Sequence, residues 1–479
     1  MKSDEKGFFW KMKKAGRTFF GVFLLVTITS FWGFAYSFDL SKQEANQGSQ
    51  KAEIIIHAEE RFQTIEGFGS SQRVWEDGHI AKAIGPPPVI PKTIQDQILK
   101  ELYTDLGLTR VRTHGVGFNT EPNNDNSEPM SFNWSQFRFD CNAVQGCGVD
   151  ARINFVMQAQ KYGLVTIISE NNPMLNWMNA SNPEEYAENT LALLLHWRER
   201  GIIPPYQTLM NEPSQTHWAN GIWHREVAKS LGPRMRDEGL KTLLVIPDDL
   251  NACSAYPIAK TVMEDPEARK YVGAIAYHMY GGNPGCLKGM KALSLQSHVP
   301  VWMTEYYLPP GYADSLRWAK EIHHLIADYG VSAVDLMWGF FGEWVIKRFN
   351  EEDLIQITFD KESRYVSHRR TSRYYITGQF SRFVRPGYVR IGTKSTNDAI
   401  LATAYRGDRK LVVVMINDSP NQKKVDIVMK GTSTPRSWFS IRTTQSENWE
   451  KNQSIESNGS RLSITLPFQS VTTLIGSEE

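Results

Sequence analysis

Short apolar runs and amphipathic segments alternate along the middle of the chain, from Gly67 to about Ser372. The runs have the length and composition of buried strands, and the last two of the amphipathic segments repeat apolar residues at i, i+3 and i+4, as helices do. Eight alternations of this kind predict an α/β fold, a (β/α)8 barrel over residues 67–373. The predicted strands are 67–71, 109–114, 164–170, 206–211, 242–247, 274–278, 301–305 and 333–338, and the predicted helices are 93–106, 151–162, 183–200, 223–238 and 312–329.

The pattern changes after residue 373. Strand-like runs become short and often alternating, with Gly, Asn, Asp or Ser between them. This pattern is typical of antiparallel sheets and predicts a β-sandwich domain over residues 374–479. A further strand-like stretch, 53–66, precedes the barrel and begins with Glu53-Ile54-Ile55-Ile56-His57. The predicted sandwich strands are 389–391, 400–406, 410–417, 425–429, 438–443, 462–466 and 470–475.

The N-terminus has the pattern of a targeting segment. Lys11, Lys13, Lys14 and Arg17 precede an uncharged stretch from residue 18 to 37. A basic start followed by an apolar run favours export, and about 20 apolar residues can also span a bilayer. Residues 1–38 are therefore predicted to be a signal peptide or a membrane anchor, and 39–52 a polar linker. Either reading makes the protein secreted, periplasmic or bound to the cell surface.

The charge balance excludes one class of partner. The formal net charge is +1, from 53 basic and 52 acidic residues. Without the six basic and two acidic residues of positions 1–36 it is −3, which leaves no basic field for a polyanion. We therefore expect no nucleic-acid partner. The expected partner is a carbohydrate, membrane contact is limited to the N-terminal segment, and the chain is expected to be a monomer.

The four cysteines fit an oxidising compartment. Cys141 and Cys147 close a short loop and could form a disulfide. Cys253 and Cys286 could form a second one or remain free thiols, because four cysteines allow three pairings and the sequence does not choose among them. None of them has the CxxC spacing of a metal site, and no metal is predicted.

Two glutamates carry the candidate chemistry. Glu212 follows an apolar run in Gln207–Pro213, and Glu305 ends the run Val301–Glu305. Side chains at the C-terminal ends of barrel strands converge on one face, so these two can share a ligand. Hydrolysis of a glycosidic bond with retention needs one carboxyl group as acid and base and another as nucleophile, about 5–5.5 Å apart. We expect Glu212 to carry the proton, Glu305 to be ionised, and Pro213 to hold the backbone of Glu212 extended.

Several neighbours could support the pair. Arg110 and Arg112 point to the same side of a strand, and either could hold Glu305 through charge-assisted hydrogen bonds. Asn211 could donate a hydrogen bond to a sugar hydroxyl. His278 could orient Glu305 or contact substrate, or could be an ordinary buried histidine. The candidates for further substrate contacts are aromatic and follow strand ends, where each could instead close the barrel: Tyr280, Trp177, Trp338 and Trp75.

Four motifs resemble glycoside hydrolase family 30, and they stand in that family's order. They are Phe62–Ser71, Pro205–Pro213, Tyr374–Gly387 and Leu466–Leu474, and the resemblance runs from about Glu53 to the end of the chain. It implies a retaining β-glycosidase of the glucosylceramidase and xylanase type, with a barrel and a sandwich that the N-terminal strand completes. By position it implies Glu212 as acid and base, Glu305 as nucleophile, Asn211 and Arg112 as supports, and no cofactor.

The chain departs from the family pattern at two loops. After the third predicted barrel strand, Asn171–Met178 keeps only the last two residues, Trp177-Met178, of the family's aromatic run. After the eighth, Gly339–Trp344 is aromatic and lacks the arginine of the members that cut glucuronoxylan. These departures leave the sugar and linkage open. They also motivate an alternative, a binding protein without catalysis on the same scaffold.

Overall fold

A computed structural model describes residues 52–81, 87–113, 120–140, 148–170, 177–431 and 435–477. The predicted export segment and the proposed Cys141–Cys147 pair lie outside these residues. Among the described helices, none combines the length and the apolar composition that a bilayer crossing requires.

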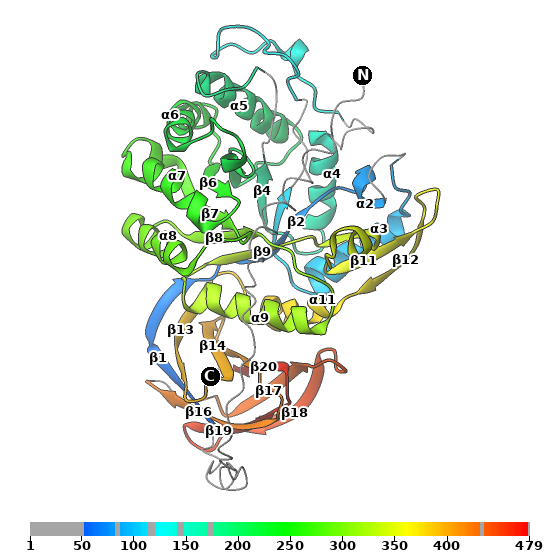
Figure 1. Cartoon of the computed structure of the whole chain (residues 1–479), viewed down its shortest axis with the longest axis vertical. Helices are drawn as coiled ribbons and strands as arrows, with labels where there is room; N and C mark the ends of the chain where they lie inside the picture. Colours follow the sequence, from blue (N-terminus) through cyan, green and yellow to red (C-terminus); the bar gives the residue numbers. More distant parts are fainter. Residues whose placement is uncertain are drawn as a thin grey trace, which may run out of the picture. The chain divides into compact units, whose positions relative to one another are not determined.

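Eight parallel strands close into a barrel, as predicted (Figure 1). Strand β2 pairs with β3 on one side and with β9 on the other, which closes the cylinder. Most positions of these strands are buried, since one face fills the barrel and the other packs under helices. The strands are β2 (Gly67–Gln72), β3 (Arg110–Thr113), β4 (Thr166–Glu170), β5 (Tyr206–Thr208), β6 (Leu243–Asp249), β7 (Val272–His278), β8 (Val301–Glu305) and β9 (Ala333–Met337).

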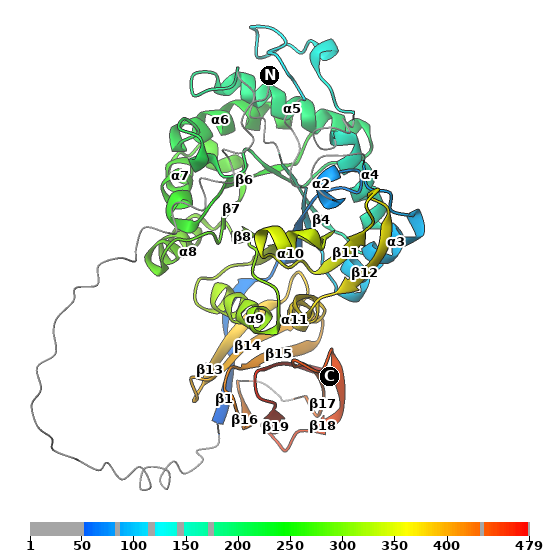
Figure 2. The same ribbon diagram turned by 45° about the vertical axis from the view of Figure 1, so that its right-hand side comes forward.

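Helices surround the barrel (Figure 2). Five agree with the predicted ranges, namely α3 (Lys92–Leu99) with its π-helical continuation (Lys100–Asp105), α4 (Val149–Gln160), α5 (Pro183–Glu199), α6 (Gly221–Asp237) and α9 (Tyr312–Ala327). Two further helices, α7 (Ala252–Glu264) and α8 (Pro284–Ser297), were not predicted. Pro257 stands inside α7, and Gly285 and Gly289 stand inside α8, so both lack the composition of a typical helix. Asparagine caps at Asn251 and Asn283 start them instead.

An insertion separates β9 from the last barrel helix. It contains β10 (Phe340–Gly342), α10 (Trp344–Phe349), β11 (Ile355–Phe359) and β12 (Tyr365–Arg370), and the three strands form a small sheet of their own. Helix α11 (Ser372–Ser381) then packs beside α9. The position predicted for the start of the sandwich, residue 374, falls inside this helix. The two short elements α2 (Gly78–Ala81) and the 3-10 turn Trp134–Gln136 lie in loops.

The C-terminal domain is a nine-stranded sheet, ordered β18-β17-β20-β15-β14-β13-β1-β16-β19. Strand β1 (Ala52–Thr64) pairs antiparallel with β13 and parallel with β16, so the N-terminal strand completes the domain as expected. Strand β18 was not predicted, because its sequence is polar. The remaining bounds are β13 (Val389–Ser395), β14 (Ile400–Gly407), β15 (Lys410–Asn417), β16 (Lys423–Lys430), β17 (Ser437–Thr443), β18 (Glu450–Glu456), β19 (Arg461–Leu466) and β20 (Ser470–Ser477).

Inward side chains from both halves of this sheet share one apolar core, which gives the sandwich. Ile54 and Ile56 of β1 meet Val413 of β15 and Leu474 of β20 there. The opposite face of β15 and β20, with Val414 among its residues, belongs to the core of the barrel instead. These two strands are therefore buried on both faces, which ties the sandwich to helices α9 and α11.

Candidate active site

Polar side chains end nearly every barrel strand, and the structure brings them together at one mouth. Ser71 stands near the end of β2, Arg112 of β3, Glu170 of β4, Asp248 of β6, His278 of β7 and Glu305 of β8, and Asn211-Glu212 follows β5. Because parallel strands deliver their C-terminal ends to one face, chain positions far apart become neighbours. Most of these side chains are buried and are linked by hydrogen bonds and ion pairs.

The two predicted carboxyl groups face each other. One carboxylate oxygen of Glu212, one of Glu305 and a ring nitrogen of His278 all lie within 4.8 Å of one another. In inverting enzymes the two carboxyl groups stand roughly 6.5–9.5 Å apart, which leaves room for a water molecule between the base and the sugar. The close approach of the Glu212 and Glu305 oxygens favours the shorter, retaining arrangement.

Glu212 adopts a backbone conformation that the sequence did not suggest. Its φ is 49° and its ψ is 56°, in the left-handed region rather than the extended one. Pro213 does exclude the right-handed helical region for Glu212, but the chain turns the other way and starts a short 3-10 turn at Pro213. This turn lets the Glu212 amide donate to the Asp248 carbonyl at 3.0 Å. Left-handed backbone at a non-glycine residue costs about 1–3 kcal/mol and is common at functional sites.

Glu305 is held from two sides. Arg112 donates through Nη1 to Glu305 Oε2 at 3.0 Å, and the Tyr280 hydroxyl donates to Oε1 at 3.0 Å. Burial, together with the charges of Glu305 and Glu212, raises the pKa of Tyr280 well above its usual value, so the phenol keeps its proton. The carboxylate is thus fixed by one cation and one neutral donor.

Arg112 is the centre of the charge network. Besides Glu305 it contacts Asp248 at 2.8 Å and Glu170 at 3.4 Å, and all four groups are buried. Burial alone would lower the pKa of Arg112, but these three carboxylates raise it, so the guanidinium is permanently charged. Arg112 also donates to the side-chain oxygen of Asn211. That contact occupies the oxygen and leaves the Asn211 amide hydrogens as donors.

Arg110, the alternative to Arg112, has a different role. It makes two hydrogen bonds to Asp335, at 3.0 and 3.1 Å, and its guanidinium lies 4.1 Å from the ring centre of Trp302. It starts β3, whereas Arg112 stands nearer that strand's C-terminal end. The position along the strand, not its face, decides which arginine reaches the site.

His278 is completely buried and lies between three acids. Its Nδ1 is 3.0 Å from Glu212 Oε1 and 3.9 Å from Glu305, and its Nε2 is 3.4 Å from Asp248. Burial acts to lower its pKa, but the Glu305 charge and the contacts to Asp248 and Glu212 outweigh it and raise the pKa to about 10. The imidazole is therefore a cation at neutral pH.

The same three residues, Glu212, His278 and Glu305, are close enough to hold a metal ion. A metal binds the neutral imidazole through a nitrogen lone pair. The raised pKa of His278 means that its nitrogens carry protons at neutral pH, so His278 acts on these acids as a hydrogen-bond donor.

The predicted aromatic contacts separate into two groups. The ring of Trp75 is 2% exposed and stacks on Phe340, with 4.2 Å between the ring centres. Of the two roles considered for Trp75, closing the barrel is therefore the one that the structure supports. Trp338 directly follows β9 and lies under the Arg73 guanidinium, 5.5 Å from the ring centre. Trp177 is half-buried and donates from its ring nitrogen to the Glu121 carbonyl at 3.0 Å. These last two remain candidates for contact with a sugar.

Sequence reasoning missed three acids at the site. Asp248 and Glu170 are buried ends of apolar strands, and their strand-end position was the signal that could have found them. Glu351 lies in the insertion after β9, where no pattern pointed to it. Burial, and then the charge of Glu305, raise the pKa of Glu351 to about 8.

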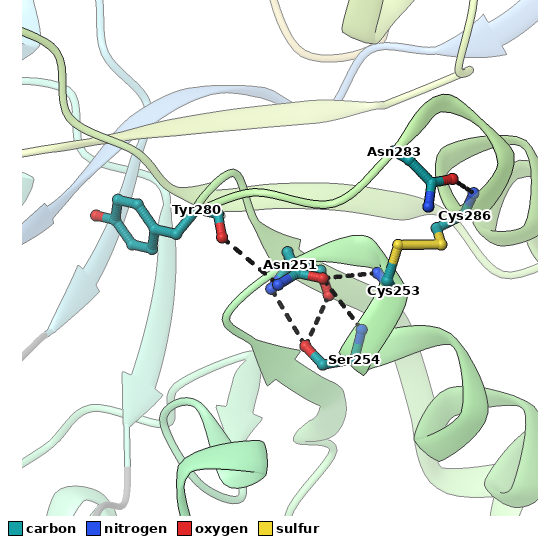
Figure 3. Close-up of a disulfide and its surroundings, with 6 residues drawn as sticks. All are labelled: Asn251, Cys253, Ser254, Tyr280, Asn283 and Cys286. Carbon is teal, nitrogen blue, oxygen red and sulfur yellow. Dashed lines mark hydrogen bonds between the residues drawn. A yellow bond between two sulfur atoms is a disulfide. The ribbon is translucent and has the colours of Figure 1, made fainter. Parts of the chain in front are cut away.

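A disulfide supports one side of the site. Cys253, at the start of α7, is bonded to Cys286, at the start of α8 (Figure 3). Asn251 caps α7 and also donates to the Tyr280 carbonyl at 3.5 Å, and the Tyr280 ring points away from the disulfide. The bridge thus fixes together the loops after β6 and β7, which follow Asp248 and His278.

The chain matches no protein-family model. Among curated proteins it is similar to the glucuronoxylanase XynC of Bacillus subtilis (strain 168), 24% identical over 300 residues. That match covers 60% of this chain and 65% of the relative, so it spans slightly less than two thirds of the curated protein's length. It is also similar to putative glucosylceramidase 2 of Caenorhabditis elegans, 22% identical over 77% of each chain.

Among solved structures, the chain is similar to the catalytic domain of xylanase C of glycoside hydrolase family 30 from Talaromyces cellulolyticus. The TM-score is 0.72 at 19% identity, over 89% of this chain and 100% of that one. Likeness at this identity establishes the fold, a barrel with a sandwich beside it. The sequence and fold matches together confirm the resemblance of the chain to glycoside hydrolase family 30.

Proposed function

We propose that the protein is a retaining β-glycoside hydrolase that works by double displacement. The observation that carries the proposal is the pair Glu212 and Glu305, with carboxylate oxygens within 4.8 Å of each other. At this spacing the second carboxylate attacks the anomeric carbon itself instead of activating a water molecule. The surrounding donors and acceptors fit these two roles.

In the first step Glu305 attacks the anomeric carbon while Glu212 protonates the departing glycosidic oxygen. The bond to the leaving group breaks as an ester bond to Glu305 forms. His278, a cation 3.0 Å from Glu212, stabilises the carboxylate that forms when Glu212 gives its proton to the leaving oxygen. Asp248 lies behind His278 and Arg112 and stabilises both positive charges.

In the second step Glu212 takes a proton from water, whose oxygen attacks the anomeric carbon and releases Glu305. The departing carboxylate regains its negative charge. Arg112 and Tyr280 already donate to its two oxygens, so they stabilise this charge as it develops. Two inversions at one carbon restore the original configuration, and the product sugar is β.

The test is the variant Glu305→Ala with an activated aryl β-glycoside. We expect turnover to be lost and partly restored by azide, which fits the space of the missing carboxylate and, in a single inverting displacement, gives an α-glycosyl azide. Glu212→Ala should lose activity mainly on substrates with poor leaving groups. Exposed Glu184→Gln is the control. Full activity of Glu305→Ala, or an α-configured first sugar product released by the wild type and detected by NMR, would refute the mechanism.

We propose that the substrate is a β-linked glucan, a xylan or a small β-glucoside. The names of the similar proteins include a glucuronoxylanase, a xylanase and a putative glucosylceramidase, which supports this range. Comparing hydrolysis of glucuronoxylan with that of unsubstituted xylan and β-glucans tests the substrate class.

We propose that the protein is exported and is secreted, periplasmic or bound to the cell surface. The basic, then apolar N-terminus supports it, and so does the Cys253–Cys286 disulfide, since disulfides persist in oxidising compartments. We also propose that it is a monomer and that its partner is a carbohydrate. The alternative, a binding protein without catalysis, does not account for a complete acid and nucleophile pair. Its original motive, the loop at 171–176, lies outside the described residues.

A further inference from the structure

A second group of acids lies away from the site described above. It joins the long loop after β3, described over residues 120–140, to the first turns of helix α5 (Figure 1). One carboxylate oxygen from each of Asp125, Glu185 and Glu188 lies within 4.8 Å of the other two. A fourth acid, Glu121, is buried nearby, and its charge is felt by Glu188.

Several oxygens of this group lack hydrogen-bond donors in the described structure. Glu188 is 0% exposed, yet both of its carboxylate oxygens have no hydrogen-bond donor within the described part of the chain. The same holds for Asp125 Oδ1, Glu185 Oε2 and the side-chain oxygen of Asn124. Buried polar atoms are normally paired, and leaving one unpaired costs about 1–3 kcal/mol. Five unpaired oxygens in one place therefore indicate a missing partner that accepts lone pairs.

Glu121 differs from these neighbours because both of its carboxylate oxygens have donors. Its two oxygens accept hydrogen bonds, one from the Asp125 amide at 3.0 Å and one from Asn189 at 2.9 Å. Glu121 is thus an internal brace of the loop, and the unpaired oxygens belong to its neighbours. The cation that affects the group, Arg234, is buried and forms no ion pair with Glu185 or Glu188 among the residues that the structure describes.

We propose that Asp125, Glu185, Glu188 and Asn124 form a binding site for a calcium-type divalent cation that fastens the loop after β3 to helix α5. Every candidate ligand is an oxygen, the donor type that Ca²⁺ prefers. Oxygens that share one Ca²⁺ at 2.3–2.6 Å can stand at most about 5 Å apart, and the carboxylate oxygens here fit within 4.8 Å. Mg²⁺ usually keeps several of its waters and is rarely held by a cage of protein oxygens alone, so a set of four protein ligands favours Ca²⁺.

The electrostatics agree with this geometry. Burial first, and then the charges of Asp125 and Glu185, raise the pKa of Glu188 to about 8. Burial is also the main reason why the pKa of Glu121 rises to about 7. Without a cation, Glu188 therefore holds a proton at neutral pH, and a cation would displace it. Binding is expected to release protons and to tighten as pH rises.

Isothermal titration of the EDTA-treated full chain with CaCl2 tests the proposal. We expect one Ca²⁺ per chain, tighter than Mg²⁺, and a rise in Tm on adding Ca²⁺. Glu188→Gln and Asp125→Asn should weaken binding at least about tenfold, since even outer-shell partners of a metal typically contribute 10–100-fold. Glu184→Gln is the matched control, because it removes an exposed charge from the same turn of α5.

The alternative is that Glu185 and Glu188 share a proton and bind no ion. In EDTA, Glu188→Gln should unfold at or above the wild-type Tm, because it replaces a buried carboxyl group whose oxygens have no described partner with a neutral amide of similar size. This check shows that the variant folds. Heats of proton release, compared in two buffers, should accompany Ca²⁺ binding. Absence of Ca²⁺ binding by the folded wild type, or equal binding by Glu188→Gln and Asp125→Asn, would overturn the proposal.

Discussion

The charged state of His278 makes a quantitative prediction for stability. Its pKa of about 10 in the folded protein lies above the value of about 6.5 expected when the chain is unfolded. Between these values the folded protein binds one more proton than the unfolded chain. The contribution of His278 is therefore complete below pH 6.5 and is lost as pH rises toward 10.

The magnitude follows from the proton difference. One proton changes the free energy of unfolding by about 1.4 kcal/mol per pH unit. The titration of His278 should therefore lower the free energy of unfolding of the wild type by about 2–3 kcal/mol between pH 7.5 and 9.5. His278→Gln removes the titrating group. The variant should be less stable than the wild type at pH 7.5, because the three surrounding carboxylates lose a cation, and the gap should narrow with pH.

Urea unfolding of the wild type and His278→Gln, in steps of half a pH unit from pH 7.5 to 9.5, measures the difference between their free energies of unfolding. The difference between wild type and variant cancels every group that titrates equally in both. His217→Gln, which removes an exposed histidine, should run parallel to the wild type throughout. A gap for His278→Gln that stays constant over the two pH units would refute the assignment of a buried imidazolium.

Three further predictions concern groups around the site. Replacing Cys253 and Cys286 together with serine opens a link across 33 positions and should lower the free energy of unfolding by about 3.7 kcal/mol by the chain-entropy relation, measured in denaturant. Arg112→Lys keeps the charge but not the fork that contacts three carboxylates, and kcat should fall about 100-fold with the protein still folded. Glu351→Gln should be more stable than the wild type above pH 8, because Glu351 is then ionised beside Glu305 in the wild type. The free energies of unfolding of the two proteins should converge toward pH 5, and a difference that does not change with pH would contradict this.

The meeting of Glu212 and Glu305 at one mouth was predictable because their positions obey a general rule. Glu212 and Glu305 each close an apolar run, and strand ends of a barrel meet at one mouth. The same rule would have placed Asp248 and Glu170 at this mouth. A carboxylate at the end of an apolar run is not recognised as part of a site, however, until the cation that pairs with it is known. Arg112 is that cation, and only the folded chain brings the three together.

The parts that could not be predicted depend on local chemistry that overrides composition. Helix α7 contains Pro257, and a capping box between Asn251 and Ser254 starts it in spite of that proline. Glu212 is left-handed because its amide finds the Asp248 carbonyl, a partner more than thirty residues away that no local pattern reveals. Strand β18 is polar, and pairing with β17 is what makes it a strand.

The position of β1 sets the order in which the protein can be assembled. This strand leaves the ribosome before the rest of the described chain, yet it pairs with β13 and β16, which follow the entire barrel in the sequence. Without β1 the other eight strands of the sheet fall into a group of six and a group of two. The sandwich can therefore close only after the barrel has been synthesised, when β1 joins these two groups.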